Sequence, residues 1–234
     1  MLRDVNMVAS NICPCKVVYG TQQTNIEKLT EKDVKCYYKH VSYSQLKETD
    51  FKAKMRYITT LQLEDGEIWK TVYVNPFDLL VENRVIEMQY KILHRIIGTN
   101  RLLYKMGKRT SPNCDQCTMY PETIEHMFFE CLIVKNFWFK LFEKYYEKKH
   151  IQVNANCTDI LLYYNLDKVQ QDVIVNILIL YGKYYIYKCK MEMMNPEIGM
   201  YAKYMAFKLS IVCMTTCKYK NEYLELYEFV KSLL

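Results

Sequence analysis

The sequence predicts a mainly α-helical, irregular fold, and three properties of its composition lead to that prediction. The 234 residues include 6 glycines and 5 prolines, which is few for a β-sandwich with many tight turns. Half of the residues are hydrophobic, which is enough to build a packed core. Leu, Ile, Lys, Glu and Met run in long stretches without helix breakers, as in helical proteins.

The first quarter of the chain gives the weakest pattern. Residues 1–40 show no readable period. Residues 42–63 are polar, and we expect short helical pieces there. Asp65-Gly66 predicts a turn, and Asp65 can cap a short helix that follows it. The apolar residues of that helix are Trp69, Val72 and Tyr73.

Two breaks delimit the next expected helix. Asn75-Pro76 should end the short helix before it, because proline lacks a backbone N–H. Asp78 is the expected N-cap of a helix that reaches about Ile97, and Gly98 should end it at the C′ position. The residues that define its apolar face are Val81, Val85, Met88, Ile92 and Ile96.

A short helix and an irregular loop come next. Thr99 can cap a helix that runs through Met106 and ends at Gly107. The segment from Ser111 to Cys131 has no helical period and contains two prolines. It therefore predicts a compact loop.

The second half of the chain predicts further helices. Residues 159–164 fit a short helix or strand, residues 169–194 one long and mostly buried helix, and residues 201–234 one or two final helices. Before them, apolar residues recur at intervals of three and four and predict an amphipathic helix. These residues are Val134, Phe137, Trp138, Leu141, Phe142, Tyr145 and Tyr146. We expect three regions, at residues 1–77, 78–150 and 151–234.

The irregular loop carries four candidate metal ligands in the pattern C-x2-C-x8-H-x4-C. A close cysteine pair suits a tight turn that places two thiolates on one ion, and thiolate and imidazole ligands select zinc over magnesium or calcium. Four protein ligands leave no open coordination position, so the site is expected to be structural and not catalytic. The sequence thus predicts a small zinc knuckle, inserted between helices, whose ligands are Cys114, Cys117, His126 and Cys131.

Other cysteines give weaker patterns. Cys13 and Cys15 could bind a second ion together with Cys36 and His40, but free thiols explain them as well. Cys213 and Cys217 lie one helical turn apart and are expected to be packed or surface thiols. With 10 cysteines, a helical composition and no apolar leader at the N-terminus, we expect an intracellular protein in the cytoplasm or nucleus. No stretch predicts a membrane span.

A basic segment precedes the knuckle. The formal net charge of +6 is a mild excess, but residues 88–113 contain six basic residues and no acid. Tyr90, Tyr104 and Tyr120 lie nearby and could stack on unpaired bases. A solvated helix face with core tyrosines would give the same pattern. The candidate phosphate contacts are Lys91, Arg95, Arg101, Lys105, Lys108 and Arg109.

Residues 88–138 resemble the zinc-binding C-terminal region of reverse transcriptases from LINE-type non-LTR retrotransposons. Weaker likeness extends back to residues 69–73 and forward to 182–183 and 185–190. Met88 stands where that family usually has an aromatic residue. The matching residues are Gln89-Tyr90-Lys91, Leu93-His94-Arg95, Thr99-Asn100, Leu103, Cys114-x-x-Cys117, Glu122-Thr123, Glu125-His126, Cys131 and Phe137-Trp138.

The resemblance implies a module that holds template RNA or target DNA, not a polymerase. The sequence has no aromatic-x-Asp-Asp motif and no adjacent aspartates, so it lacks the polymerase metal site. It shows no paired nucleophile and base, no phosphate loop and no open metal site, so we do not expect an enzyme. The alternative is a zinc-stabilised protein-interaction scaffold or a decayed transposon remnant. Its partner surface would use Phe137, Trp138, Phe142, Met191, Met193 and Met194.

Overall fold

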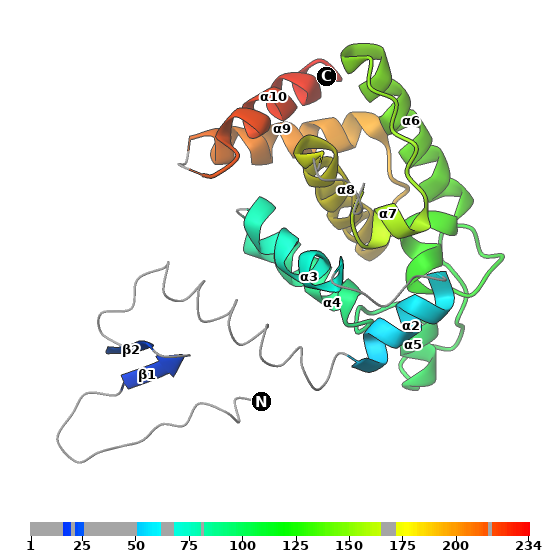
Figure 1. The fold of residues 1–234 in the computed structure, drawn as a ribbon. Helices are drawn as coiled ribbons and strands as arrows, with labels where there is room; N and C mark the ends of the chain where they lie inside the picture. Colours follow the sequence, from blue (N-terminus) through cyan, green and yellow to red (C-terminus); the bar gives the residue numbers. More distant parts are fainter. Residues whose placement is uncertain are drawn as a thin grey trace. The chain divides into compact units, whose positions relative to one another are not determined.

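The structure is a computed structural model, which describes residues 16–19, 22–25, 51–61, 68–80, 82–164, 172–214 and 217–234. The chain forms two compact units, Met1–Met55 and Arg56–Leu234 (Figure 1). In the first unit, β1 (Lys16–Tyr19) pairs antiparallel with β2 (Gln22–Asn25). Residues 1–40 show no readable period, so these two strands were not predicted. The region boundaries expected at 77/78 and 150/151 remain predictions.

The rest of the described chain is helical, which confirms the predicted mainly α fold. Within the described residues, ten elements follow the strands. They are α2 (Phe51–Leu61), α3 (Ile68–Leu79), α4 (Asn83–Leu93), α5 (Asn100–Lys105), the π-helical turn η2 (His126–Glu130), α6 (Leu132–Lys149), α7 (Cys157–Leu161), α8 (Val173–Met191), α9 (Ile198–Cys213) and α10 (Lys220–Lys231).

Helix α8 is the centre of the second unit. Helices α3, α4, α9 and α10 all contact it, and Figure 1 shows it between them. The segment 177–183 of α8 is buried on every side, as expected for a helix without a polar face. Buried tyrosine hydroxyls join the helices by donating to backbone carbonyls: Tyr57 to Ile92, Tyr201 to Leu178 and Tyr223 to Leu79.

Helices α6 and α8 meet where a glycine faces a tryptophan. A Cβ atom added to Gly182 would lie 2.5 Å from Cη2 of Trp138, so only glycine leaves room for the indole ring. The Trp138 ring is 3% exposed, and its Nε1 donates to the carbonyl of Phe128 at 2.8 Å. Since Phe128 belongs to η2, this tryptophan fixes the π-helical turn against the helical core.

Two sequence predictions about the start of α4 are wrong. Helix α3 passes through Pro76 and ends at Leu79, so Asn75-Pro76 does not break it and Asp78 lies inside α3. Helix α4 begins at Asn83 with Glu82 at the N-cap position. The missing proline hydrogen bond costs less than the packing of α3 against α4 and α8 provides.

The end of α4 also differs from the prediction. The helix ends at Leu93, and the residue with left-handed backbone is Arg95 (φ 56°), not Gly98. The amide of Ile96 bonds back to the carbonyl of Lys91 at 2.9 Å, which closes a Schellman-type end. An arginine tolerates this unfavourable φ because its side chain is held by an internal ion pair, described below.

Most other predicted elements are confirmed. The side chain of Thr99 accepts from the amide of Leu102 at 3.2 Å, and α5 ends before Gly107, which has φ +66°. Residues 159–164 include the end of short helix α7, and residues 201–234 form two helices. The Asp65-Gly66 turn lies outside the described residues. Among the described helices, none is both long enough and apolar enough to span a membrane.

Candidate metal centre

The four predicted ligands converge on one point. One ligand atom from each of Cys114, Cys117, His126 and Cys131 lies within 4.8 Å of all the others. Sγ of Cys117 and Nε2 of His126 are 3.2 Å apart. Cys114, His126 and Cys131 are buried, and Cys117 is half-buried. Ligands of a tetrahedral site with metal–sulfur bonds of about 2.3 Å lie about 3.8 Å apart, so the spacing suits one ion.

A tight turn presents the first cysteine pair. The amide of Thr118 donates to the carbonyl of Cys114 at 2.9 Å, and Thr118 adopts a left-handed φ of 57°. The amide of Cys114 bonds to the carbonyl of Tyr120 at 2.9 Å, and a bridge between Asn113 and Pro121 closes the loop. The hydrogen bond to Cys131 and burial raise the pKa of the Cys114 thiol, although the backbone N–H groups of Cys117 and Gln116 act in the opposite direction.

The π-helical turn η2 presents the second pair. The amide of Cys131 donates to the carbonyl of His126 at 3.0 Å, so these residues are linked by an i→i−5 bond. This bond brings together two residues that are five apart. The x4 spacing between histidine and cysteine is therefore explained by a wide turn, which sequence reasoning missed. The hydroxyl of Thr123 caps the turn by accepting from the amide of His126 at 3.0 Å.

The environment of Cys131 favours its thiolate. Its pKa is lowered to about 7, first because the Cys114 thiol donates a hydrogen bond to it. The backbone amides of Ile133 and Val134, at the start of α6, lower it further. The same bond raises the pKa of Cys114, the donor. The amide dipoles at the α6 N-terminus thus stabilise a negative charge on the Cys131 sulfur, and this charge would balance a bound cation.

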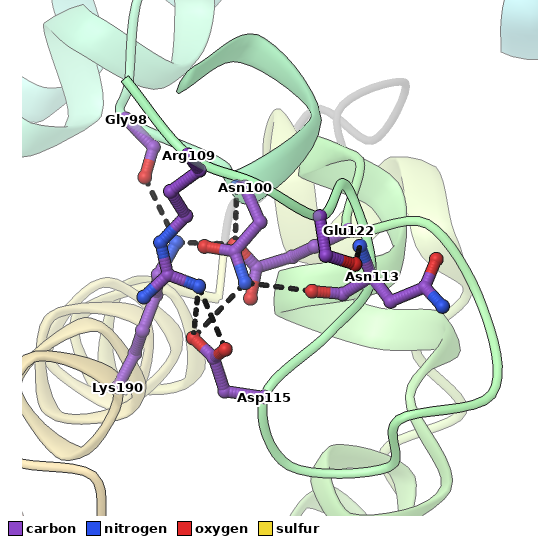
Figure 2. A network of polar contacts seen from close by, with 8 residues as sticks. Gly98, Asn100, Arg109, Asn113, Asp115, Glu122 and Lys190 are labelled. Atoms are coloured by element: carbon purple, nitrogen blue, oxygen red, sulfur yellow. Dashed lines mark hydrogen bonds and ion pairs between the residues drawn. The ribbon is translucent and has the colours of Figure 1, made fainter. Parts of the chain in front are cut away.

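A polar network outside the four ligands joins the loop to α5 (Figure 2). The backbone N–H of Asn100 donates to Oε1 of Glu122 at 2.8 Å. Nδ2 of Asn100 donates to the carbonyl of Asn113 at 2.7 Å and to Oδ2 of Asp115 at 2.9 Å. Although partial burial acts to raise the pKa of Asp115, hydrogen bonds from Arg109 and Asn100 hold it below its ordinary value. The network orients Asp115, the residue after the first ligand.

A buried ion pair ties the same network to the end of α8. Nζ of Lys190 contacts Oε1 of Glu122, with both side chains under a tenth exposed, and also donates to the carbonyl of Gly98 at 2.9 Å (Figure 2). Nε2 of Gln116 donates to the carbonyl of Met194 at 3.1 Å. Asn100 and Glu122 are among the residues that resemble the reverse-transcriptase region, and Lys190 lies in the stretch of weaker likeness. Glu122 and Lys190 are 68 residues apart, so the sequence did not reveal their contact.

Three of the six predicted phosphate contacts have acidic partners. Lys91 pairs with Glu87 at 2.7 Å, and Nη1 of Arg109 contacts Oδ1 of Asp115 at 2.7 Å. Nη2 of Arg95 lies 2.6 Å from Oε1 of Glu125 in a largely buried pair. The Arg95 guanidinium also lies over the ring of Tyr57, 4.6 Å from its centroid. Arg95 is thus an internal residue, which a run of like charges in the sequence does not reveal.

The other three basic residues lie together on one exposed surface. Arg101 and Lys105 belong to α5 and are one helical turn apart, and Lys108 follows two residues after the C-cap. All three side chains are exposed, and no ion pair involves them within the described residues. Tyr104 lies between them and is 49% exposed. We call Arg101, Tyr104, Lys105 and Lys108 the α5 surface.

The remaining candidates fall into two groups. Cys13, Cys15, Cys36 and His40 lie outside the described residues, so a second metal cluster there stays a prediction. Cys213 and Cys217 are half-buried free thiols, and no disulfide occurs in the described part of the chain. Of the other tyrosines near the basic segment, Tyr120 is 59% exposed, whereas Tyr90 is half-buried with its ring 4.0 Å from that of His94.

The fold and the site define a helical protein with a Cys-Cys-His-Cys cluster that could hold a metal ion. Residues 38–138 match the family model described as zinc-binding in reverse transcriptase, and this segment contains all four clustered side chains. This segment is therefore similar to a zinc-binding domain of reverse transcriptases. No curated protein and no solved structure matches the chain.

Proposed function

We propose that the chain is a zinc-stabilised nucleic-acid-binding module of the kind found in LINE-type non-LTR retrotransposon reverse transcriptases. The observation that carries the proposal is the closed set of Cys114, Cys117, His126 and Cys131 within a segment that matches the reverse-transcriptase zinc-binding model. The module would act inside the cell and would have no polymerase activity of its own, because the sequence lacks the motif for the catalytic metals.

The donor set fits zinc. Three sulfur atoms and one imidazole nitrogen are ligands that zinc takes in structural sites, and each group lies within 4.8 Å of the others. The two half-sites are built by different local structures, a tight turn and a π-helical turn. A bound Zn²⁺ would link them and would neutralise the thiolates that the backbone amides favour. Four protein ligands leave it a structural ion.

The α5 surface would contact nucleic acid. Its three cations project from one short segment without acidic partners, so they can bind successive phosphates, and Tyr104 can stack on a base between them. The polar network of Asn100, Glu122 and Lys190 would hold this segment rigidly on the metal loop. Lys91, Arg95 and Arg109 would contribute less, because each is already paired.

A salt titration tests the proposal. The full chain should bind a fluorescent single-stranded RNA or DNA 20-mer, and affinity should fall steeply as salt rises. Replacing Arg101, Lys105 and Lys108 by Gln removes three phosphate contacts, so the slope of log K against log salt should become shallower by about 2. The matched control replaces Arg84, Lys203 and Lys220 by Gln, which are exposed and lie on other helices. No binding at low salt, or equal losses in both triple variants, would contradict the proposal.

A second candidate is a protein-interaction scaffold, and the exposed methionines favour it. Met191, Met193 and Met194 are 63%, 90% and 46% exposed at the end of α8. Of the three aromatic residues expected in the partner surface, Phe137 and Trp138 are under a twentieth exposed and cannot contact a partner, and Phe142 is half-buried. A partner that binds here should lose affinity when Met191 and Met193 become Gln, while nucleic-acid binding stays unchanged.

A further inference from the structure

A groove lined by aromatic side chains runs along α6. It has a volume of about 570 Å³ and lies between α6 and the segment 152–155. His150, with a left-handed φ of 55°, ends α6 and reverses the chain, so that the following segment runs back beside the helix to α7 (Figure 1). The aromatic rings in its lining are Phe129, Trp138, Phe139, Phe142 and Tyr146.

The rings form a row on one face of α6. Phe139, Phe142 and Tyr146 are separated by three and four residues, so their side chains follow one another at intervals of about one helical turn, about 5 Å. Phe139 is 66% exposed and Tyr146 is 51% exposed. The ring of Phe142 is half-buried and stacks on Trp138 with an angle of 16° between the planes. Phe139 and Tyr146 are thus the exposed rings of the row, beside the stacked pair of Trp138 and Phe142.

The polar groups around the groove suit a nucleotide chain. Lys135, exposed at the end nearest Cys131, lies over the ring of Phe129, with Nζ 5.8 Å from its centroid. Gln152 and Asn154 are exposed amides on the opposite wall and can bond to base edges. Glu143 also lines the groove, and a carboxylate accepts from base amino groups. Helix α6 as a whole has five lysines against two glutamates.

The lining distinguishes bases from an apolar peptide. A groove that takes an amphipathic helix presents a broad apolar surface, whereas this lining has two small aliphatic side chains, Val153 and Ala155, and combines five aromatic rings with charged and amide groups. Every base has a π-face, so a row of open rings binds unpaired bases whatever their sequence. Phosphates would lie toward Lys135, away from Glu143. The lining itself carries one cation and one anion, so Lys135 is the phosphate contact within the groove.

We propose that this groove is a second nucleic-acid site, which stacks two or more unpaired bases of a single strand on Phe139 and Tyr146. The inference rests on the proposed nucleic-acid function and deepens it, because it requires single-stranded character. The α5 surface would bind mainly through phosphates, with one base on Tyr104, and the groove through a row of bases. Duplexes, whose bases are already stacked, should not use the groove.

Two arms of one binding experiment test the groove. Fluorescence anisotropy of the full, zinc-loaded chain is measured with a dT 12-mer, an abasic 12-mer of equal charge and a 12-base-pair duplex. Phe139→Ala with Tyr146→Ala should weaken dT 12-mer binding at least tenfold without changing the salt slope, since no cation is removed. The same double variant should bind the abasic strand and the duplex as the unaltered chain does. Phe207→Ala, which removes a 65% exposed ring on α9, is the matched control and should bind normally.

The outcomes separate the two proposals. If the unaltered chain binds none of the three probes, the proposed function and the groove both fail. If it binds but prefers the dT 12-mer less than twofold over the abasic strand, the groove alone is overturned, independently of how any variant folds. Loss of a dimer on size-exclusion chromatography in the double variant, with dT binding unchanged, would show that a second copy occupies the groove and would also overturn it.

Discussion

The metal loop, residues 106–131, and the surroundings of α8 hold their shape by different means. The loop has few buried apolar side chains and is closed by four converging ligands and a polar network. The helices around α8 are joined by apolar side chains and tyrosines, with α8 itself almost wholly buried. The shape of the metal loop should therefore depend on a bound ion, and that of the helices around α8 on packing. Trp138 and Lys190 join the two regions.

Removing a ligand should have the largest effect and should act on the loop alone. In His126→Ala or Cys131→Ser the site loses its metal, whose binding free energy is on the order of 10 kcal/mol in structural zinc sites. Hydrogen exchange should then become fast in residues 106–131 and stay slow in α8. Cys213→Ser, which removes a half-buried thiol elsewhere, is the control. Equal deprotection of α8 and the loop would show that the two regions do not differ as described.

Lys183 should give the next largest effect, because its titratable amine is buried in the packed region. It is 1% exposed, and its Nζ donates to Oε1 of Gln89 at 2.6 Å and to the carbonyl of Leu161 at 3.3 Å, both neutral acceptors. Burial lowers its pKa well below the ordinary 10.5. Lys183→Arg would fix a charge there, since arginine does not deprotonate, and should destabilise the fold by about 3 kcal/mol or more in urea unfolding.

The same lysine predicts a pH dependence. Between its lowered folded pKa and 10.5, the unfolded chain holds this proton and the folded chain does not, so stability rises with pH in that window. In Lys183→Met this contribution disappears. In the pH range below 10.5 where the folded chain has lost this proton, the free energy of unfolding should therefore rise more steeply with pH in the unaltered chain than in Lys183→Met, by up to about 1.4 kcal/mol per pH unit. Equal slopes would mean that Lys183 is charged in the fold.

A change at Gly182 should destabilise the contact between α6 and α8, which belongs to the packed region. In Gly182→Ala the new methyl group meets the Trp138 ring at 2.5 Å, and the overpacking should cost about 1–3 kcal/mol even after the gain in helix propensity. Gly199→Ala on α9 is the matched control, because nothing lies within 4 Å of its added Cβ. It should be neutral or stabilising by up to about 1 kcal/mol. The midpoints of denaturant unfolding compare the two.

Arg109 should give the smallest effect. Its pair with Asp115 is about two-fifths exposed on both sides, so the charge interaction is screened by solvent. Arg109→Gln should change the free energy of unfolding by less than about 1 kcal/mol and should leave zinc content unchanged. A loss of metal in this variant would show that the outer network, and not the ligand set, holds the loop together.

The sequence predicted what depends on spacing along the chain. The ligands Cys114, Cys117, His126 and Cys131 follow a pattern that local turns can close, and the structure brings them together. Helices α6 and α8 follow from their apolar periods and lengths. The sequence predicted an irregular loop around the H-x4-C spacing, and the π-helical turn, whose i→i−5 bond aligns residues five apart, was missed.

What depends on distant partners was missed. Helix α3 continues through Pro76 because of packing that the local sequence does not show. The contact between Glu122 and Lys190 spans 68 residues, and no pattern in either segment points to the other. The basic run begins just after Glu87 and contains no acid, yet Glu87, Asp115 and Glu125 neutralise three of its members in space. Charge along a chain is therefore a weaker guide to a binding surface than ligand spacing is to a metal site.

The zinc content of the purified chain tests directly whether the four clustered side chains bind a metal ion. The full chain, purified without added metal or chelator, should contain one zinc ion per molecule by elemental analysis, and Cys114→Ser should contain little or none. Cobalt exchanged into the unaltered chain should give the visible absorption of a tetrahedral thiolate site. No more than trace zinc in the unaltered chain, or equal zinc in Cys114→Ser, would contradict the assignment of Cys114, Cys117, His126 and Cys131 as the metal centre.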